Sequence, residues 1–94
     1  MISIIEKIKE KVQAAFDDVE SKEFLEKTVK NSVEKHRRNF AEFKAQKPNE
    51  SFEFWKTNIL LSVNLNSTNK DEIMSIGIFL LALDEFAKEH NTLV

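Results

Sequence analysis

Residues 73–83 (IMSIGIFLLAL) form the longest apolar run of the chain, and they restrict how it can fold. Only Ser75 and Gly77 interrupt the run, and Gly77 is the only glycine among the 94 residues. A membrane-spanning helix needs roughly 20 apolar residues, so a run of about half that length predicts no membrane span. We therefore expect the run to lie in the protein core or against another chain.

The spacing of residues in and around this run predicts a helix over about 69–90. Its apolar residues recur in steps of three and four, which is the helical period. They are Ile73, Ile76, Leu80, Leu83 and Ala87. The polar segment 67–72 just before them has the spacing of a capping box. Because the helix is apolar on nearly every side at its start, we expect it to be central in its bundle or shared with a partner.

Gly77 needs its own explanation, because glycine inside a helix costs about 1 kcal/mol relative to alanine. No turn is predicted at this position. We therefore expect another helix, from the same chain or from a second copy, to approach closely there. By helical spacing, Ile73 and Leu80 share the side on which Gly77 lies.

Two amphipathic helices are predicted ahead of this one. Apolar stripes at helical spacing indicate a first helix over about 2–19 and a second over about 22–46. The second ends before Pro48, because the residue preceding a proline avoids helical geometry. With only a short polar hinge between them, the two helices predict an antiparallel helical hairpin over 2–46.

The segment between Pro48 and the last helix is ambiguous. Trp55, Ile59 and Val63 recur in steps of four and favour a helix over about 50–64. Apolar and polar residues also alternate over 59–65, which would suit an extended strand. We favour the helix, because a lone strand would find a pairing partner only in a second copy of the chain.

Composition supports an all-α fold, a compact four-helix bundle in a single domain over 1–94. The chain is 41% hydrophobic and 32% charged, with one glycine and one proline, so it has few turn formers and many helix formers. It has no cysteine, and its N-terminus lacks the features of a secretory signal. We therefore expect a cytoplasmic protein.

Residues suited to catalysis or metal binding are present but poorly grouped. Glu23 with Glu26, and Glu50 with Glu53, place carboxylates one turn apart, and two such pairs facing each other could bind magnesium. A magnesium-dependent nucleotide phosphohydrolase is thus the second alternative function. His36 lies on the apolar stripe of its helix, where we expect a hydrogen bond to a carboxylate or carbonyl. We predict no catalytic residue, metal site or cofactor, and no enzymatic activity.

Positive charge is concentrated in the middle of the chain. Residues 30–47 hold six Lys or Arg and two Glu, between acidic segments on either side, although the whole chain carries −2. We name as an anionic-partner patch the residues Lys30, Lys35, Arg37, Arg38 and Lys44. Binding of an anionic ligand or nucleic acid through this basic helix is the first alternative function, but nucleic-acid binders usually carry more positive charge. Salt bridges to acidic helices or to an acidic partner are favoured instead.

Apolar surface exceeds what one small bundle needs. Phe52, Phe54 and Trp55 cannot all face inward from one helix, so at least one should be exposed or pack on another chain. The predicted partner interface comprises Phe52, Phe54, Trp55, Gly77, Ile78 and Leu81. We therefore predict a small non-enzymatic protein–protein interaction module of the inhibitor, immunity or assembly-factor type, which self-associates as a homodimer and binds a protein partner.

Overall fold

Each helix begins at a polar side chain that accepts a hydrogen bond from the backbone N–H three residues later. The structure is a computed structural model that describes residues 3–93. Its elements are α1 (Ile4–Ala15), α2 (Val19–Gln46), α3 (Phe52–Leu61) and α4 (Lys70–Leu93), with no strand in that range. The capping residues are Ser3, Asp18, Ser51 and Asn69. The prediction of an all-α four-helix bundle is confirmed.

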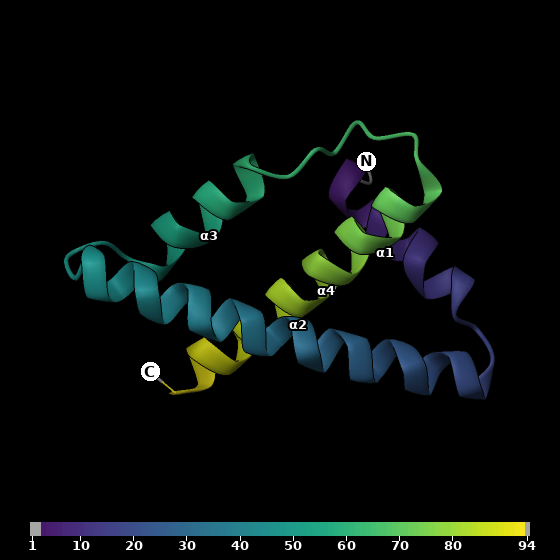
Figure 1. The fold of residues 1–94 in the computed structure, drawn as a ribbon, viewed down its shortest axis with the longest axis horizontal. Helices are drawn as coiled ribbons and strands as arrows, with labels where there is room; N and C mark the ends of the chain where they lie inside the picture. The colour runs from purple at the N-terminus through teal and green to yellow at the C-terminus, as the bar shows by residue number, and fades with distance from the viewer. Residues whose placement is uncertain (1–2, 94) are drawn as a thin grey trace.

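α4 is the central helix, because both α1 and α2 pack mainly against it. In Figure 1, α1 lies beside the first half of α4. α2 runs along the length of the molecule and crosses α4. α1 and α2 are joined by only three residues, but they do not pack along each other as the predicted hairpin would. Each buries its apolar stripe on the apolar α4 instead.

Gly77 marks the point where α1 crosses α4. A Cβ atom added to Gly77 would overlap Val12 Cγ2, and would lie 3.0 Å from Val12 Cβ and 3.5 Å from Ile8 Cγ2. Val12 and Ile8 are both buried. The predicted close approach of another helix at this glycine is confirmed, and the helix comes from the same chain.

The main core joins α2, α3 and α4. Its buried members are Val29, Val33, Phe52, Trp55, Ala82, Leu83 and Phe86. Phe40 of α2 connects them, since its ring lies 5.2 Å from Phe52, 5.1 Å from Trp55 and 5.9 Å from Phe86. Such tilted and edge-on ring pairs add to the stability that the buried area itself provides. These rings attach the short helix α3 to the rest of the molecule.

Helix bounds differ from the predicted ones by a few residues. α1 stops at Ala15 rather than 19, and its predicted start at residue 2 lies outside the described residues. α2 starts at Val19, three residues before the predicted 22, because Asp18 caps it. α3 covers less than 50–64, and the extended alternative for 59–65 is not seen: a link of turns follows Leu61. α4 begins at Lys70, one residue after the predicted 69, and ends at Leu93, three residues after the predicted 90.

Among these helices, none within residues 3–93 combines the length and apolar character needed to cross a lipid bilayer.

Candidate protein-interaction groove

An open groove of about 380 Å³ runs between α2 and α3. One side is a row of residues spaced four apart at the end of α2, Asn39, Phe43 and the C-cap Lys47. The other side is a row of α3 with the same spacing, Phe54, Asn58 and Ser62. Trp55 and Ile59 lie between the two rows. Because residues four apart lie on the same side of a helix, each row runs along the groove.

Aromatic rings give the groove its shape. Trp55 is buried, and its indole Nε1 donates a hydrogen bond to Asn39 Oδ1 at 3.1 Å. The rings of Phe43 and Phe54 stack with centroids 6.2 Å apart, yet Phe54 remains 43% exposed. A fixed, half-exposed aromatic beside a buried tryptophan is typical of protein-binding sites.

Two side-chain amides at the groove each have a polar group that makes no hydrogen bond with the described residues. Asn39 accepts from Trp55 through its oxygen, and its NH2 group makes no hydrogen bond within residues 3–93. Asn58 donates to the carbonyl of Phe54 at 2.9 Å, so its oxygen is likewise unused in the described part of the chain. One donor and one acceptor beside apolar rings can orient a partner's polar groups.

The apolar surface continues along the outer face of α3. Phe54 and Leu61 are seven residues apart and therefore share a face, and Leu61 is 78% exposed. Asn58 lies on the same face between them. α3 thus carries apolar residues on two sides, one buried in the core and one exposed, as expected from the density of apolar residues in this segment.

The six predicted interface residues separate into distinct places. Phe52, Trp55 and Gly77 are buried within this chain, and Ile78 and Leu81 are partly buried beside the core. Only Phe54 has a largely exposed side chain. The structure therefore brings Phe54 and Trp55 together at the groove, while Gly77, Ile78 and Leu81 lie on α4.

The five residues of the anionic-partner patch also separate. Arg37 forms a bidentate ion pair with Glu89 of α4, with Nε and Nη2 at 3.0 and 2.7 Å from its oxygens, and also pairs with Glu34. Lys44 donates to the backbone carbonyls of Pro48 and Glu50. Lys30, Lys35 and Arg38 are exposed. Two of the five cations thus stabilise the chain itself, and the expectation of salt bridges to acidic helices is confirmed for Arg37.

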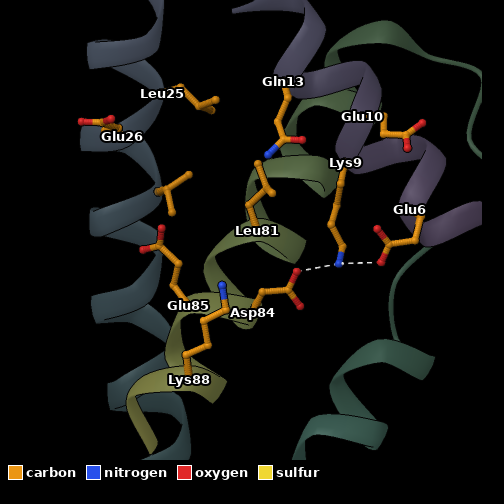
Figure 2. Close-up of a pocket in the computed structure, with 11 residues that line it drawn as sticks. Glu6, Lys9, Glu10, Gln13, Leu25, Glu26, Leu81, Asp84, Glu85 and Lys88 are labelled. Atoms are coloured by element: carbon orange, nitrogen blue, oxygen red, sulfur yellow. Dashed lines mark hydrogen bonds and ion pairs between the residues drawn. The ribbon is translucent and has the colours of Figure 1, made fainter. Parts of the chain in front are cut away.

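A second, more polar groove of about 480 Å³ lies where α1 and α2 diverge over α4. In Figure 2, Lys9 of α1 reaches between Glu6 and Asp84. Its Nζ lies 2.5 Å from Asp84 Oδ2 and 3.1 Å from Glu6 Oε1. Partial burial lowers the pKa of Lys9, but the hydrogen bonds and charges of Asp84 and Glu6 outweigh it and raise the pKa above its ordinary value. The lysine holds α1 on α4.

The carboxylate pairs proposed for magnesium do not meet. Glu23 and Glu26 lie near the start of α2, whereas Glu50 and Glu53 follow its end, so roughly 30 Å of helix separates the pairs. No group of three His, Asp or Glu side chains suited to a metal ion occurs within residues 3–93. The arrangement of four carboxylates that a magnesium-dependent phosphohydrolase would need is therefore not formed.

His36 is a buried residue of the core. Its Nε2 lies 3.1 Å from the carbonyl oxygen of Phe79, and its ring packs edge-on against that of Phe79. Burial lowers the pKa of His36, and the carbonyl hydrogen bond opposes this only in part. The predicted role, a core histidine bound to a carbonyl, is confirmed. His90 stacks on Phe52 with ring centroids 4.1 Å apart.

Sequence reasoning missed Asn39, Phe43 and Asn58 as groove residues. The sequence does show that Lys35, Asn39, Phe43 and Lys47 are spaced four apart and therefore lie in one row on the helix. This row runs beside the apolar stripe. Reading it as a groove requires knowing which side of α2 the helix α3 covers, and no local pattern gives that.

No protein-family model, characterised protein or solved structure shows a significant match to this chain.

Proposed function

We propose that this chain is a non-enzymatic protein-interaction module that binds a protein partner in the groove between α2 and α3. The observation that carries the proposal is Phe54, an aromatic side chain that stays exposed while its ring is fixed against Phe43. Exposed aromatic anchors of this kind contribute much of the energy of protein–protein contacts. Leu61 and the two groove amides add apolar area and polar groups that fix orientation.

Photo-crosslinking in cells that carry the protein tests this proposal. A photoreactive amino acid at Asn58, in the groove, should give protein adducts, and Phe54→Glu in the same chain should abolish them. The matched control places the same amino acid at Lys70, an exposed position at the start of α4. Adducts equal at both positions, or unaffected by Phe54→Glu, would contradict binding in the groove.

Nucleic-acid binding through the basic helix 30–47 has less support. Arg37 and Lys44 are engaged within the chain, which leaves Lys30, Lys35 and Arg38 from the predicted patch. Binding of a fluorescent oligonucleotide at low salt, lost on Lys35→Glu with Arg38→Glu, would favour it.

A further inference from the structure

A second exposed apolar site lies at the opposite end of α2 from the groove. We call it the α1–α2 corner and define it by Phe16, Val19 and Phe24. The rings of Phe16 and Phe24 stack with centroids 6.1 Å apart, and Phe24 and Val19 are 60% and 74% exposed. In Figure 1 the link between α1 and α2 is at one end of the long helix and α3 is at the other. The chain therefore exposes stacked phenylalanine pairs at both ends of α2.

The two ends of α2 carry opposite charge. Residues 17–26, around the corner, hold five acidic residues and one lysine. Residues 35–47, beside the groove, hold five Lys or Arg and one glutamate, Glu42. Acids near the start and bases near the end of a helix favour its dipole, but that effect is confined to the first and last turns. It does not account for Glu23, Glu26, Lys35 or Arg38, which lie farther in.

Several of these charges have no partner among residues 3–93. The side chains of Lys35, Arg38 and Lys47 make no hydrogen bond or ion pair within residues 3–93. The carboxylates of Glu20 and Glu23 make none with the described residues either. An apolar corner with an acidic rim and an apolar groove with a basic rim are thus complementary in both respects.

One chain cannot bring these two sites together. The helical rise puts Phe24 and Phe43 roughly 30 Å apart along α2, a single uninterrupted helix. A two-fold contact centred on either site would be unfavourable, because a patch on a two-fold axis meets its own copy. Groove against groove would oppose Lys35, Arg38 and Lys47 to themselves, and corner against corner would oppose acids to acids. A reciprocal two-fold contact, in which the corner of each copy meets the groove of the other, keeps the charges complementary.

We infer that the α1–α2 corner of one copy docks in the α2–α3 groove of another, so that the chain self-associates through two unlike sites. The inference rests on the proposed function, since it names the occupant of the groove proposed there. Such a contact gives a closed dimer if it is reciprocal about a two-fold axis, and a ring or an open filament if it is heterologous. The homodimer predicted from the sequence would be the reciprocal form.

Sedimentation of two purified variants, alone and mixed, tests the inference. Phe24→Lys places a positive charge against the basic groove, and Phe54→Glu places a negative charge against the acidic corner. We expect wild type to grow in size with concentration, and each variant's dissociation constant to rise at least about tenfold. An equimolar mixture keeps one intact corner and one intact groove, so it should associate more tightly than either variant alone.

Exposed charges give an independent pair of variants that leave the apolar packing untouched. Glu20→Lys with Glu23→Lys alters the corner, and Lys35→Glu with Arg38→Glu alters the groove. Each alone should stay monomeric, and a mixture of intact corner with intact groove should again pair. Ile4→Lys is the control, because it removes a half-exposed apolar side chain outside both sites and should assemble like wild type.

A wild-type protein that stays monomeric up to about 1 mM would overturn the inference. So would a Phe54→Glu or Phe24→Lys variant that forms the same dimer as wild type, which indicates a two-fold contact elsewhere. Either result leaves the proposed function standing if groove crosslinks at Asn58 capture a different protein. If no groove crosslink forms at all, the proposed function fails as well.

Discussion

Gly77 and Val12 show how one atom can set the distance between two helices. Val12 is fully buried and its branched side chain is stiff, so it cannot turn away from a new Cβ on Gly77 without moving α1. Glycine therefore lowers the intrinsic stability of α4, but it allows α1 to pack closely against α4.

We predict that Gly77→Ala destabilises the protein, although alanine is the better helix former by about 1 kcal/mol. Forcing a methyl group into this packed contact should cost about 1–3 kcal/mol in overpacking. Urea denaturation measures the balance. In a double-mutant cycle, Val12→Ala should recover part of the loss, because it removes the methyl groups that collide. A stabilising Gly77→Ala would mean that α1 can shift away freely.

His36 makes the stability of the core depend on pH. Burial lowers its pKa in the folded state, so the unfolded chain binds the proton more tightly and acid favours unfolding. Stability from the neutral imidazole is present above its unfolded pKa, roughly 6.5, and is lost as the pH falls toward the lower folded value. We predict a decline in the free energy of unfolding between about pH 7 and pH 5.

The variant His36→Gln retains a side-chain N–H donor for the carbonyl of Phe79 but cannot titrate in this range. Its free energy of unfolding, measured by urea denaturation at several pH values, should change less than that of wild type over the same window. Asp18, whose pKa is lowered by hydrogen bonds from the backbone and hydroxyl of Ser21, loses its contribution only at more acidic pH. Identical pH profiles for the two proteins would show that His36 is not the titrating group.

Among the elements, α3 depends most on its ends and its few large side chains. It has only ten residues, and a helix of that length is marginal on its own in water. The Ser51 hydroxyl accepts from Phe54 N–H at 3.0 Å, and Trp55 and Phe52 attach the helix to the core.

We predict that Ser51→Ala weakens α3 selectively, because losing an N-cap costs about 0.5–2 kcal/mol. Hydrogen exchange should show faster exchange of the α3 amides, with those in the middle of α2 and α4 unchanged. The matched control is Ser3→Ala, which removes the corresponding cap of α1 and should affect α1 alone. Faster exchange throughout the molecule in Ser51→Ala would show that α3 is not a separate unit of opening.

Helix positions were largely predictable from local chemistry. The period of three and four gave α4, and the capping-box segment 67–72 contains its cap, Asn69. The predicted start of α2 was wrong because Asp18 and Ser21 are both good capping residues, and local sequence does not rank them. The alternation of apolar and polar residues over 59–65 suggested a strand that does not form. These residues belong to the end of α3 and to the link between α3 and α4.

At the scale of the whole molecule, α4 holds the bundle together. Leu83 is almost fully buried in the main core, whereas the ion pair between Arg37 and Glu89 is partly open to solvent. Buried apolar area contributes much more to the free energy of unfolding than an exposed ion pair does.

We predict that Leu83→Ala lowers the free energy of unfolding by about 2–5 kcal/mol, from lost burial and the cavity left behind. Arg37→Ala should lower it by at most about 1 kcal/mol, and less at high salt, as for other surface ion pairs. Thermal or urea unfolding of both variants at two salt concentrations makes the comparison. An equal effect of the two substitutions would contradict a stability dominated by the core.

The candidate site was only half predictable. The excess of aromatics around Phe54 and Trp55 predicted an exposed aromatic in this segment, because three aromatics in four residues cannot all face one side. Gly77, Ile78 and Leu81 lie on the central helix instead, since the excess apolar surface there is covered by α1 and α2. Which residues of α2 face α3 depends on tertiary packing, so the groove could not be predicted.

The central position of α4 also has a consequence for synthesis of the chain. α1, α2 and α3 leave the ribosome before the helix on which α1 and α2 pack. During that interval the apolar stripes of α1 and α2, and the stacked phenylalanines at both ends of α2, are all exposed together. Nascent chains are therefore most open to chaperones and to wrong contacts with one another just before residues 70–93 emerge.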